Sequence, residues 1–147
     1  MCAALFLQDS GMPPLKYAVL AAALLVAAPA AAQEPSLFGA WRNPKNSVHV
    51  DIRPCAQGAC GYVIWASDKA KRDAAEGGNP NLIGMQLFRE FQPKKNGVWQ
   101  GKVFVPDLNR TFSGQAEPLD GNRLRAKGCF LGNLLCKTQV WTRLDKG

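Results

Sequence analysis

Apolar and polar residues alternate along most of the chain in short segments, and this period of two is typical of β-strands with one buried face. In the clearest segment, Val48, Val50 and Ile52 alternate with polar or charged neighbours. Similar segments follow one another to the end of the chain. They predict eight short strands, within residues 39–43, 46–54, 61–66, 85–91, 98–105, 111–117, 123–130 and 137–144.

Tight turns join most of these segments, so the predicted strands follow one another in meander order. Asn96-Gly97 is the strongest hairpin signal, because both residues tolerate the positive φ of a two-residue turn. Eight strands in this order suit a small antiparallel up-and-down barrel, which closes on itself and leaves no exposed edge. The sequence therefore predicts an all-β fold of this kind.

The phase of the strands indicates which residues face the barrel interior. Three consecutive inner faces combine a large residue with one glycine, namely Trp99 with Gly101, Phe112 with Gly114, and Leu124 with Gly128. A glycine inside a strand marks a sharp bend or a close approach of another group. These glycines either make room for bulky side chains opposite or leave a cavity, and both interpretations stay open.

The segment 67–81 breaks the meander, because it is polar and poor in β-forming residues. Asp68 can cap a single helical turn through Arg72 to Ala75, which Gly77-Gly78 would end. Loops of this length between barrel strands are uncommon and often functional. We place the mouth of any ligand site beside this loop, and a surface insertion without a partner is the alternative.

The first 32 residues differ in composition from the rest. A short cationic front end precedes an apolar run from Tyr17 to Ala28 and the small residues Ala30–Ala32. This layout predicts a secretory signal peptide, residues 1–32, with Met12 as the better start. The run is shorter than the roughly 20 residues of a membrane span, so we expect no stable span after cleavage. Residues 33–147 then form one domain, periplasmic or secreted.

Four of the five cysteines lie in that domain. In an oxidising compartment, Cys55, Cys60, Cys129 and Cys136 predict two disulfide bonds, and four cysteines allow three pairings. Local pairing is preferred, because each close pair brackets a compact turn that contains glycine. A zinc site or a redox pair is less consistent with these spacings, which lack a CxxC motif or a nearby histidine.

The net charge of +7 is unchanged by removal of the signal peptide. Outside the cytosol, such a charge favours anionic envelope components over nucleic acid as partners. Arg123, Arg125 and Lys127 alternate on the outer face of one predicted strand, and we call them the basic stripe. The stripe is either an anion-binding surface or an ordinary solvated face.

Several motifs together resemble a bacterial family catalogued as domain of unknown function 2147. They are GAWRNPKNSVHVDIRPC, CGYVIWA, the pattern D-x5-NPN from Asp73 to Asn81, WQGKVFVPD and GCFLGNLLCKTQVWTRL. The resemblance covers residues 38–144 and implies an exported protein with a lipocalin-like (calycin-like) antiparallel barrel. It implies no activity. The Gly39-x-Trp41 motif is also similar to that of lipocalins, which implies that Arg143 of the last strand packs over Trp41 at the closed end.

The residue types offer little catalytic chemistry. Nucleophilic catalysis needs an activated Ser or Cys with a base in reach, but the cysteines are expected in disulfides and His49 stands among solvent-facing residues. The acids of the 67–81 loop are interspersed with cations, as in a solvated loop. We therefore expect a non-enzymatic monomer without cofactor or metal.

Two functions remain. The first is the binding of a small apolar or amphipathic ligand in the barrel, with five candidate residues: Trp65, Asn79, Asn81, Trp99 and Phe112. The second is an envelope protein, such as an inhibitor, that binds a macromolecule through residues 67–81 and the basic stripe.

Overall fold

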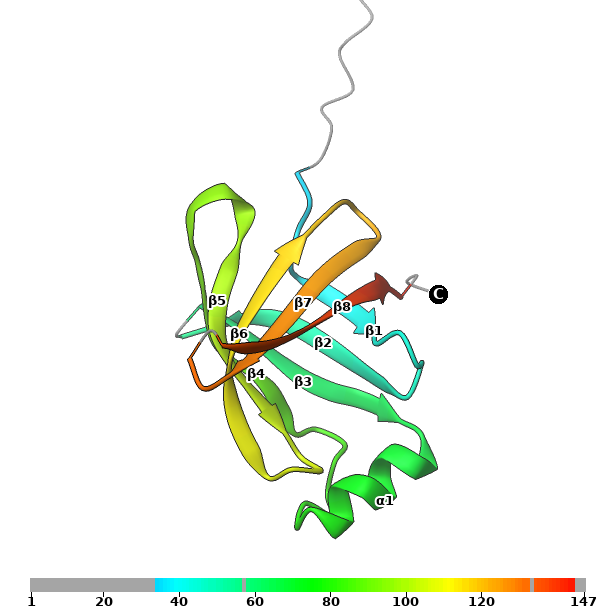
Figure 1. Cartoon of the computed structure of the whole chain (residues 1–147). Coiled ribbons are helices and arrows are strands. Elements are labelled where there is room, and N and C mark those ends of the chain that lie inside the picture. The colour runs from blue at the N-terminus through cyan, green and yellow to red at the C-terminus, as the bar shows by residue number, and fades with distance from the viewer. Residues whose placement is uncertain (1–33, 57, 133, 145–147) are drawn as a thin grey trace, which may run out of the picture. The chain divides into compact units, whose positions relative to one another are not determined.

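The computed structural model describes residues 34–144 apart from 57 and 133, so the predicted signal peptide lies outside the described residues. No helix in these residues is long and apolar enough to cross a membrane. The fold (Figure 1) consists of β1 (Gly39–Arg42), β2 (Val48–Cys55), β3 (Gly58–Ala66), α1 (Asp68–Glu76), β4 (Gln86–Pro93), β5 (Trp99–Val105), β6 (Arg110–Pro118), β7 (Arg123–Phe130) and β8 (Leu135–Arg143), with a short 3-10 turn at Lys95–Gly97.

The eight strands form one closed antiparallel barrel in sequence order, which confirms the predicted architecture. The ring closes where Trp41 and Arg42 of β1 pair with Arg143 and Thr142 of β8. Because the strands run up and down, the connections after β1, β3, β5 and β7 lie at one end of the barrel. We call this the open end, and the opposite end the closed end.

The inner face of the closed half is filled by aromatic side chains of β4. The pairing of β4 with β5 shifts between Arg89 and Gln92, and Glu90 adopts a φ of +54°. Such an extra residue breaks the strict alternation of the strand. It allows both Phe88 and Phe91 to be buried, with ring centroids 5.4 Å apart in an edge-to-face arrangement.

Two glycines make this aromatic filling feasible. Gly101 of β5 and Gly114 of β6 face each other across the sheet. The ring of Phe91 lies where a side chain at either position would begin, 2.7 Å and 3.1 Å from the ideal Cβ positions. At these two positions glycine therefore makes room for a bulky neighbour, which was one of the two interpretations of the glycine pattern.

Trp41 is the centre of the closed end. Its side chain is fully buried, and its indole nitrogen donates a hydrogen bond of 2.9 Å to the carbonyl oxygen of Leu37. The guanidinium carbon of Arg143 lies 4.0 Å from the centre of the Trp41 ring. This is the cation–π contact that the lipocalin-like motif implies.

The guanidinium group of Arg143 also ties two other segments to β8. It donates hydrogen bonds to the carbonyl oxygens of Ser36 and Phe38, at 2.7 and 2.8 Å, and to that of Gly121 in the β6–β7 turn. Gly39 has a φ of +123°, and a Cβ atom there would collide with the guanidinium group. The first residue of the Gly39-x-Trp41 motif is thus a glycine because Arg143 occupies its side-chain space.

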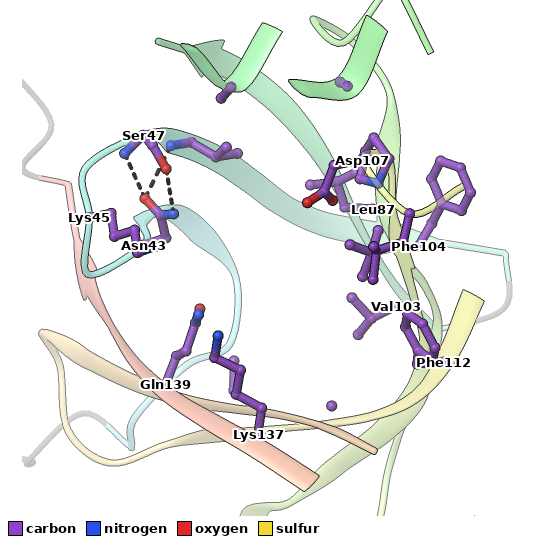
Figure 2. A pocket seen from close by; sticks show the side chains of 18 of the residues that line it. Asn43, Lys45, Ser47, Leu87, Val103, Phe104, Asp107, Phe112, Lys137 and Gln139 are labelled. Atoms are coloured by element: carbon purple, nitrogen blue, oxygen red, sulfur yellow. Dashed lines mark hydrogen bonds between the residues drawn. The ribbon is translucent and has the colours of Figure 1, made fainter. Parts of the chain in front are cut away.

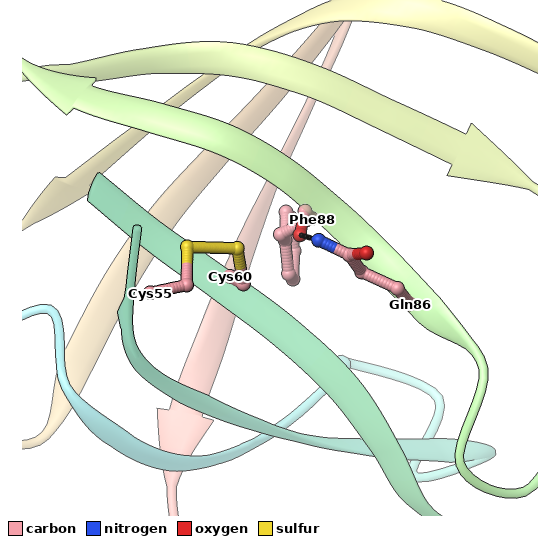
Figure 3. The surroundings of a disulfide bond; sticks show 4 residues. All are labelled: Cys55, Cys60, Gln86 and Phe88. Carbon is pink, nitrogen blue, oxygen red and sulfur yellow. Dashed lines mark hydrogen bonds between the residues drawn. A yellow bond between two sulfur atoms is a disulfide. The ribbon is translucent and has the colours of Figure 1, made fainter. Parts of the chain in front are cut away.

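Two disulfides staple hairpins at opposite ends of the barrel. Cys55 bonds to Cys60 across the β2–β3 hairpin, and Cys129 bonds to Cys136 across the β7–β8 hairpin. Figure 3 shows the first bridge and the neighbouring residues of β4. The preferred local pairing is therefore confirmed. Each bridge closes a short loop and on chain-entropy grounds adds about 2–2.5 kcal/mol to stability.

The turn chemistry follows the sequence closely at two hairpins. Asn96 and Gly97 adopt φ values of +61° and +72°, as predicted for the β4–β5 turn. At the β6–β7 turn, the Asp120 carboxylate accepts hydrogen bonds of 2.8 Å from the backbone N–H groups of Asn122 and Arg123. These local preferences fix the strand register on either side.

The segment after β3 forms more helix than predicted. α1 has nine residues, whereas the sequence pattern predicted a single turn. Ser67, not Asp68, caps it, because the Ser67 hydroxyl accepts a 3.2 Å hydrogen bond from the backbone N–H of Ala70. Asp68 instead lies in the first turn of α1, where its negative charge interacts favourably with the helix dipole.

Replacement of Trp41 by alanine tests the closed end. Because Trp41 is fully buried beneath Arg143, Trp41→Ala should lower the free energy of unfolding by about 3–5 kcal/mol in a denaturant titration. Trp65→Ala is the matched control, because that ring is exposed, and should cost less than about 1 kcal/mol. Equal losses for the two variants would contradict this account.

The Gly39 position gives a second test. Gly39→Ala must both adopt a left-handed φ and displace Arg143. Gly84→Ala, at a φ of +83° in open space, has only the cost of the left-handed φ. That cost is about 1–2 kcal/mol for a residue with a Cβ atom. We expect Gly39→Ala to lower the free energy of unfolding by clearly more than Gly84→Ala. Equal stability of the two variants would show that Arg143 moves aside without loss.

Candidate functional site

The open end of the barrel contains a cavity of about 600 Å³. Its walls come from the β1–β2 turn, α1, the β5–β6 turn and the inner faces of β4 to β8 (Figure 2). A barrel of this strand number can hold one small ligand, and ligand pockets commonly measure roughly 300–1,000 Å³. The cavity therefore has the size of a site for a small molecule.

Large apolar side chains form the floor of the cavity. The ring of Phe88 meets that of Trp141 edge to face, with centroids 5.7 Å apart, and so separates the cavity from the filled half of the barrel. The floor consists of Leu82, Leu87, Phe88, Val103, Phe112 and Trp141. An apolar part of a ligand would readily displace water from the surface that these residues form.

Gly128 explains why this half of the barrel is open. It pairs with Gly114 of β6 and continues the row of inward positions across the sheet. Nothing lies within 4 Å of the position that a Cβ atom would take at Gly128. Here the glycine leaves space, so the two interpretations of the glycine pattern each apply to a different half of the barrel.

β8 adds polar groups to the cavity. Lys137 and Gln139 pair with Gly128 and Ala126 of β7, which are inward positions, and Figure 2 shows both side chains directed into the cavity. Lys137 forms no ion pair within the described residues. Lys137 as a whole residue is exposed.

The β1–β2 turn forms a rigid polar edge of the mouth. The Asn43 side-chain oxygen accepts hydrogen bonds from the backbone N–H groups of Ser47 and Val48, at 2.8 and 3.1 Å. The Asn43 amide nitrogen donates a third bond, of 2.8 Å, to the Ser47 hydroxyl. Lys45 at the tip of this turn is exposed and also lines the cavity.

α1 forms the adjacent wall, because the backbone N–H of Ser67 at its start donates a 2.9 Å hydrogen bond to the carbonyl oxygen of Ser47. Ala70 and Ala74 of the helix line the cavity together with Lys69 and Asp73, whose side chains form a 2.6 Å ion pair. The mouth of the cavity thus lies beside the 67–81 loop, the position that the sequence pattern predicts for the mouth of any ligand site.

Asn79 ties the end of this loop to the β5–β6 turn. Its side-chain nitrogen donates hydrogen bonds to the Pro106 carbonyl oxygen, at 2.8 Å, and to the Asn109 side-chain oxygen, at 3.3 Å. Gly77 approaches the same turn so closely that a Cβ atom there would collide with the backbone of Pro106 and Asp107. Asn79 and Gly77 therefore position the walls of the mouth, and neither lines the cavity itself.

The five residues that the sequence suggested as ligand contacts lie in different places relative to the cavity. Phe112 lines the cavity. Asn79 is occupied by the hydrogen bonds just described, and Asn81 is exposed outside the cavity lining. Trp65 and Trp99 also lie outside the lining, for separate reasons.

Trp65 lies on the outer face of the barrel because β3 contains a bulge. His49 pairs with Trp65 but Val50 pairs with Val63, so Ile64 is an extra residue. Ile64 and Trp65 are consequently both exposed, at 46% and 43%. Strict alternation, on which the prediction depended, fails at this point.

Trp99 lies near the closed end. It is partly buried against the core, and its ring meets that of Phe38 edge to face at a centroid distance of 5.7 Å. Its phase was predicted correctly as inward. Its position along β5 places it beyond the aromatic floor, in the filled half of the barrel.

His49 belongs to a small cluster on the outer face. Its ring stacks on Trp65 with a centroid distance of 4.4 Å, and its Nε2 lies 2.7 Å from the side-chain oxygen of Asn46. Partial burial, and secondarily the positive charge of Arg42, lower the pKa of His49. This arrangement orients the imidazole away from the cavity.

The basic stripe is largely neutralised by neighbouring acids. Arg123 lies 2.7 Å from the Asp120 carboxylate, and Arg125 lies 2.8 Å from that of Glu117. Lys127 forms no ion pair within the described residues. The stripe therefore presents less free positive charge than its sequence suggests.

The polar groups of β8 were missed in the sequence, although a signal for them existed. Trp141 is the buried aromatic of the last strand, and a period of two from Trp141 leads back to Gln139 and Lys137. A lysine on an inward face is unusual unless the barrel is open to solvent there. A strand that is buried at Trp141 and carries an inward lysine at position 137 therefore has its cavity end at the lysine.

Comparisons with known proteins agree with this barrel. The sequence profile of a family described as uncharacterized protein conserved in bacteria (DUF2147) matches residues 39–143. Among solved structures, the chain is similar to protein HP1028 from the human pathogen Helicobacter pylori, which is described as belonging to the lipocalin family. The TM-score is 0.60 and the identity 15%, over 76% of this chain and 84% of that one. No curated protein matches the chain.

The His49 cluster generates a prediction about pH. Because its folded-state pKa is lowered, His49 contributes stability that is present above about pH 6.5 and is lost as the pH falls through the folded-state pKa. Trp65→Ala removes the stacked ring and should raise the pKa of His49 towards its ordinary value. NMR titration can measure this directly, since the chain has one histidine.

Trp65→Phe is the control for this prediction, because a smaller aromatic ring still covers the imidazole. It should leave the pKa of His49 nearer to that of the unmodified chain. An unchanged pKa in Trp65→Ala would show that burial by the indole is not the cause of the shift.

Proposed function

From the premise that the chain belongs to the DUF2147 family and forms a lipocalin-like barrel, we propose that it binds one small amphipathic molecule in the open-end cavity. The observation that carries this proposal is the cavity itself, about 600 Å³ with an apolar floor and a polar mouth. A ligand with an apolar body and a polar end would match both parts.

The polar end of the ligand would be acidic. Lys137 projects into the cavity without an acidic partner among the described residues, and Gln139 beside it can donate or accept a hydrogen bond. Lys45 adds a second cation at the mouth, while Asp107 is the acid of the β5–β6 turn. A carboxylate or a comparable anion beside Lys137 would replace water around an already exposed ammonium group, at little desolvation cost.

We place this activity outside the cytosol, in the periplasm or the secreted fraction. Two disulfides support this location, because such bonds persist in oxidising compartments and are rare in the cytosol. The signal peptide predicted within residues 1–32 supports it independently.

We also propose a carrier and not a catalyst. The cysteines that could act as nucleophiles are bonded to each other, and His49 is held on the outer face by Trp65 and Asn46. The alternative of a macromolecular partner on the basic stripe has less support, because Arg123 and Arg125 are paired with acids.

A cavity-filling substitution tests the proposal. Gly128→Leu should place an isobutyl group in the cavity and obstruct it without a backbone clash, since nothing lies near its Cβ position. We expect it to weaken binding of the anionic amphiphile 1-anilinonaphthalene-8-sulfonate at least tenfold in a fluorescence titration. Gly121→Leu, in the β6–β7 turn at the closed end and equally unobstructed, is the matched control and should bind like the unmodified chain.

A charge variant separates the two parts of the proposal. Lys137→Gln should weaken binding of the anionic probe severalfold and leave binding of the neutral probe N-phenyl-1-naphthylamine unchanged. Equal binding of both probes by Gly128→Leu and the unmodified chain would place the ligand elsewhere and overturn the proposal. Unchanged binding of the anionic probe by Lys137→Gln would remove the acidic end from it.

A further inference from the structure

The β7–β8 hairpin carries a group of exposed apolar residues at its tip. Phe130, Leu131, Leu134 and Leu135 are exposed by 41%, 76%, 81% and 63%, and we call them the apolar tip. The Cys129–Cys136 disulfide closes the hairpin directly behind them. Contiguous exposed apolar groups on a soluble domain usually mark an interaction site.

The apolar tip is continuous with the cavity. The ring of Phe130 packs on that of Phe112, a floor residue, with centroids 4.0 Å apart. Leu135 pairs with Phe130 across the hairpin. An apolar path therefore leads from the tip of the hairpin along two aromatic rings into the cavity.

The neighbouring turn extends the same surface. The register of β6 with β7, in which Ser113 pairs with Cys129, carries the β5–β6 turn and the apolar tip to the same end of the barrel. Leu108 of that turn is 51% exposed. The open end thus presents apolar side chains from two adjacent turns.

We propose that the apolar tip docks the open end of the barrel on a bilayer that contains anionic phospholipids. Lys127 lies two residues behind the disulfide on β7, and Arg110 begins the adjacent strand β6. Neither forms an ion pair in the part of the chain that the structure describes. These two cations outnumber the single acid of the adjacent turn, Asp107.

The order of groups along the hairpin matches the depth profile of a lipid surface. Leucine and phenylalanine side chains at the tip would enter the boundary of the acyl chains, and Lys127 and Arg110 behind them would meet the phosphates of the headgroups. A partner protein would instead need a pocket that receives a narrow tip together with the cations behind it. A bilayer provides both chemistries over any area, and amphipathic molecules partition into it.

The size of the effect follows from this geometry. Withdrawal of one leucine side chain from the acyl boundary should weaken binding at least tenfold. Loss of one cation near an anionic surface should weaken it about fivefold. The interaction should also weaken with added salt, because the cations are exposed.

Vesicle sedimentation tests the proposal, with protein that the expressing cell has exported. The unmodified protein should bind vesicles of phosphatidylethanolamine and phosphatidylglycerol more tightly than vesicles of phosphatidylcholine. Leu131→Ser with Leu134→Ser should weaken binding to the anionic vesicles at least a hundredfold, and Lys127→Gln about fivefold. The control is Ile64→Ser with Val140→Ser, which removes two apolar side chains, exposed by 46% and 44%, from the outer wall of the barrel. It should bind like the unmodified protein.

Two results would overturn the docking proposal. They are no binding of the unmodified protein to anionic vesicles, and equal loss of binding in the tip and control variants. If vesicle binding is absent and the protein is a dimer that the tip variant converts to a monomer, the tip would be assigned to a second copy of the chain. Gly128→Leu separates this proposal from that of a cavity ligand, because an obstructed cavity should leave vesicle binding intact.

Discussion

The closure of the barrel depends on one arginine. β1 is the shortest strand and pairs with β8 through two residue pairs, so the backbone alone joins the ends of the sheet weakly. Arg143 adds what the short ladder lacks: it covers the ring of Trp41 and binds backbone carbonyls of the segment before β1 and of the β6–β7 turn. A guanidinium group suits this place, because its planar array of donors serves several acceptors at once, which an ammonium group on a flexible stem cannot do with the same geometry.

The division of the interior into a filled and an open half follows from where the aromatic residues lie on one strand. A bulge in β4 turns both Phe88 and Phe91 inwards, and Gly101 and Gly114 accept the second ring. The same row of inward positions reaches Gly128, but the residue opposite it on β8 is Lys137. A lysine cannot fill a dry core without a partner for its charge. The charge therefore keeps this half of the barrel in contact with water.

The strand count, the meander order, the hairpin at Asn96-Gly97 and the pairing of the cysteines could be predicted from the sequence, because each depends on local pattern or short spacing. The content of the barrel could not. The bulges in β3 and β4 reverse the phase within a strand and expose Trp65, and single extra residues leave no trace in a pattern of alternation. Whether an inward glycine leaves empty space or makes room for a neighbouring side chain depends on residues from other strands.

The β7–β8 hairpin combines demands that conflict in an ordinary hairpin. Its inner face must leave space at Gly128, while its tip exposes leucines that would gain free energy by folding back into that space. The Cys129–Cys136 bond holds the two strands together at the point where the ladder ends and the tip begins. Collapse of the tip onto the floor would require the strands to bend on the stapled side, and the ring of Phe130 already occupies the path beside Phe112. The disulfide thus lies between the two features that carry our proposals, the inward space at Gly128 and the exposed apolar tip.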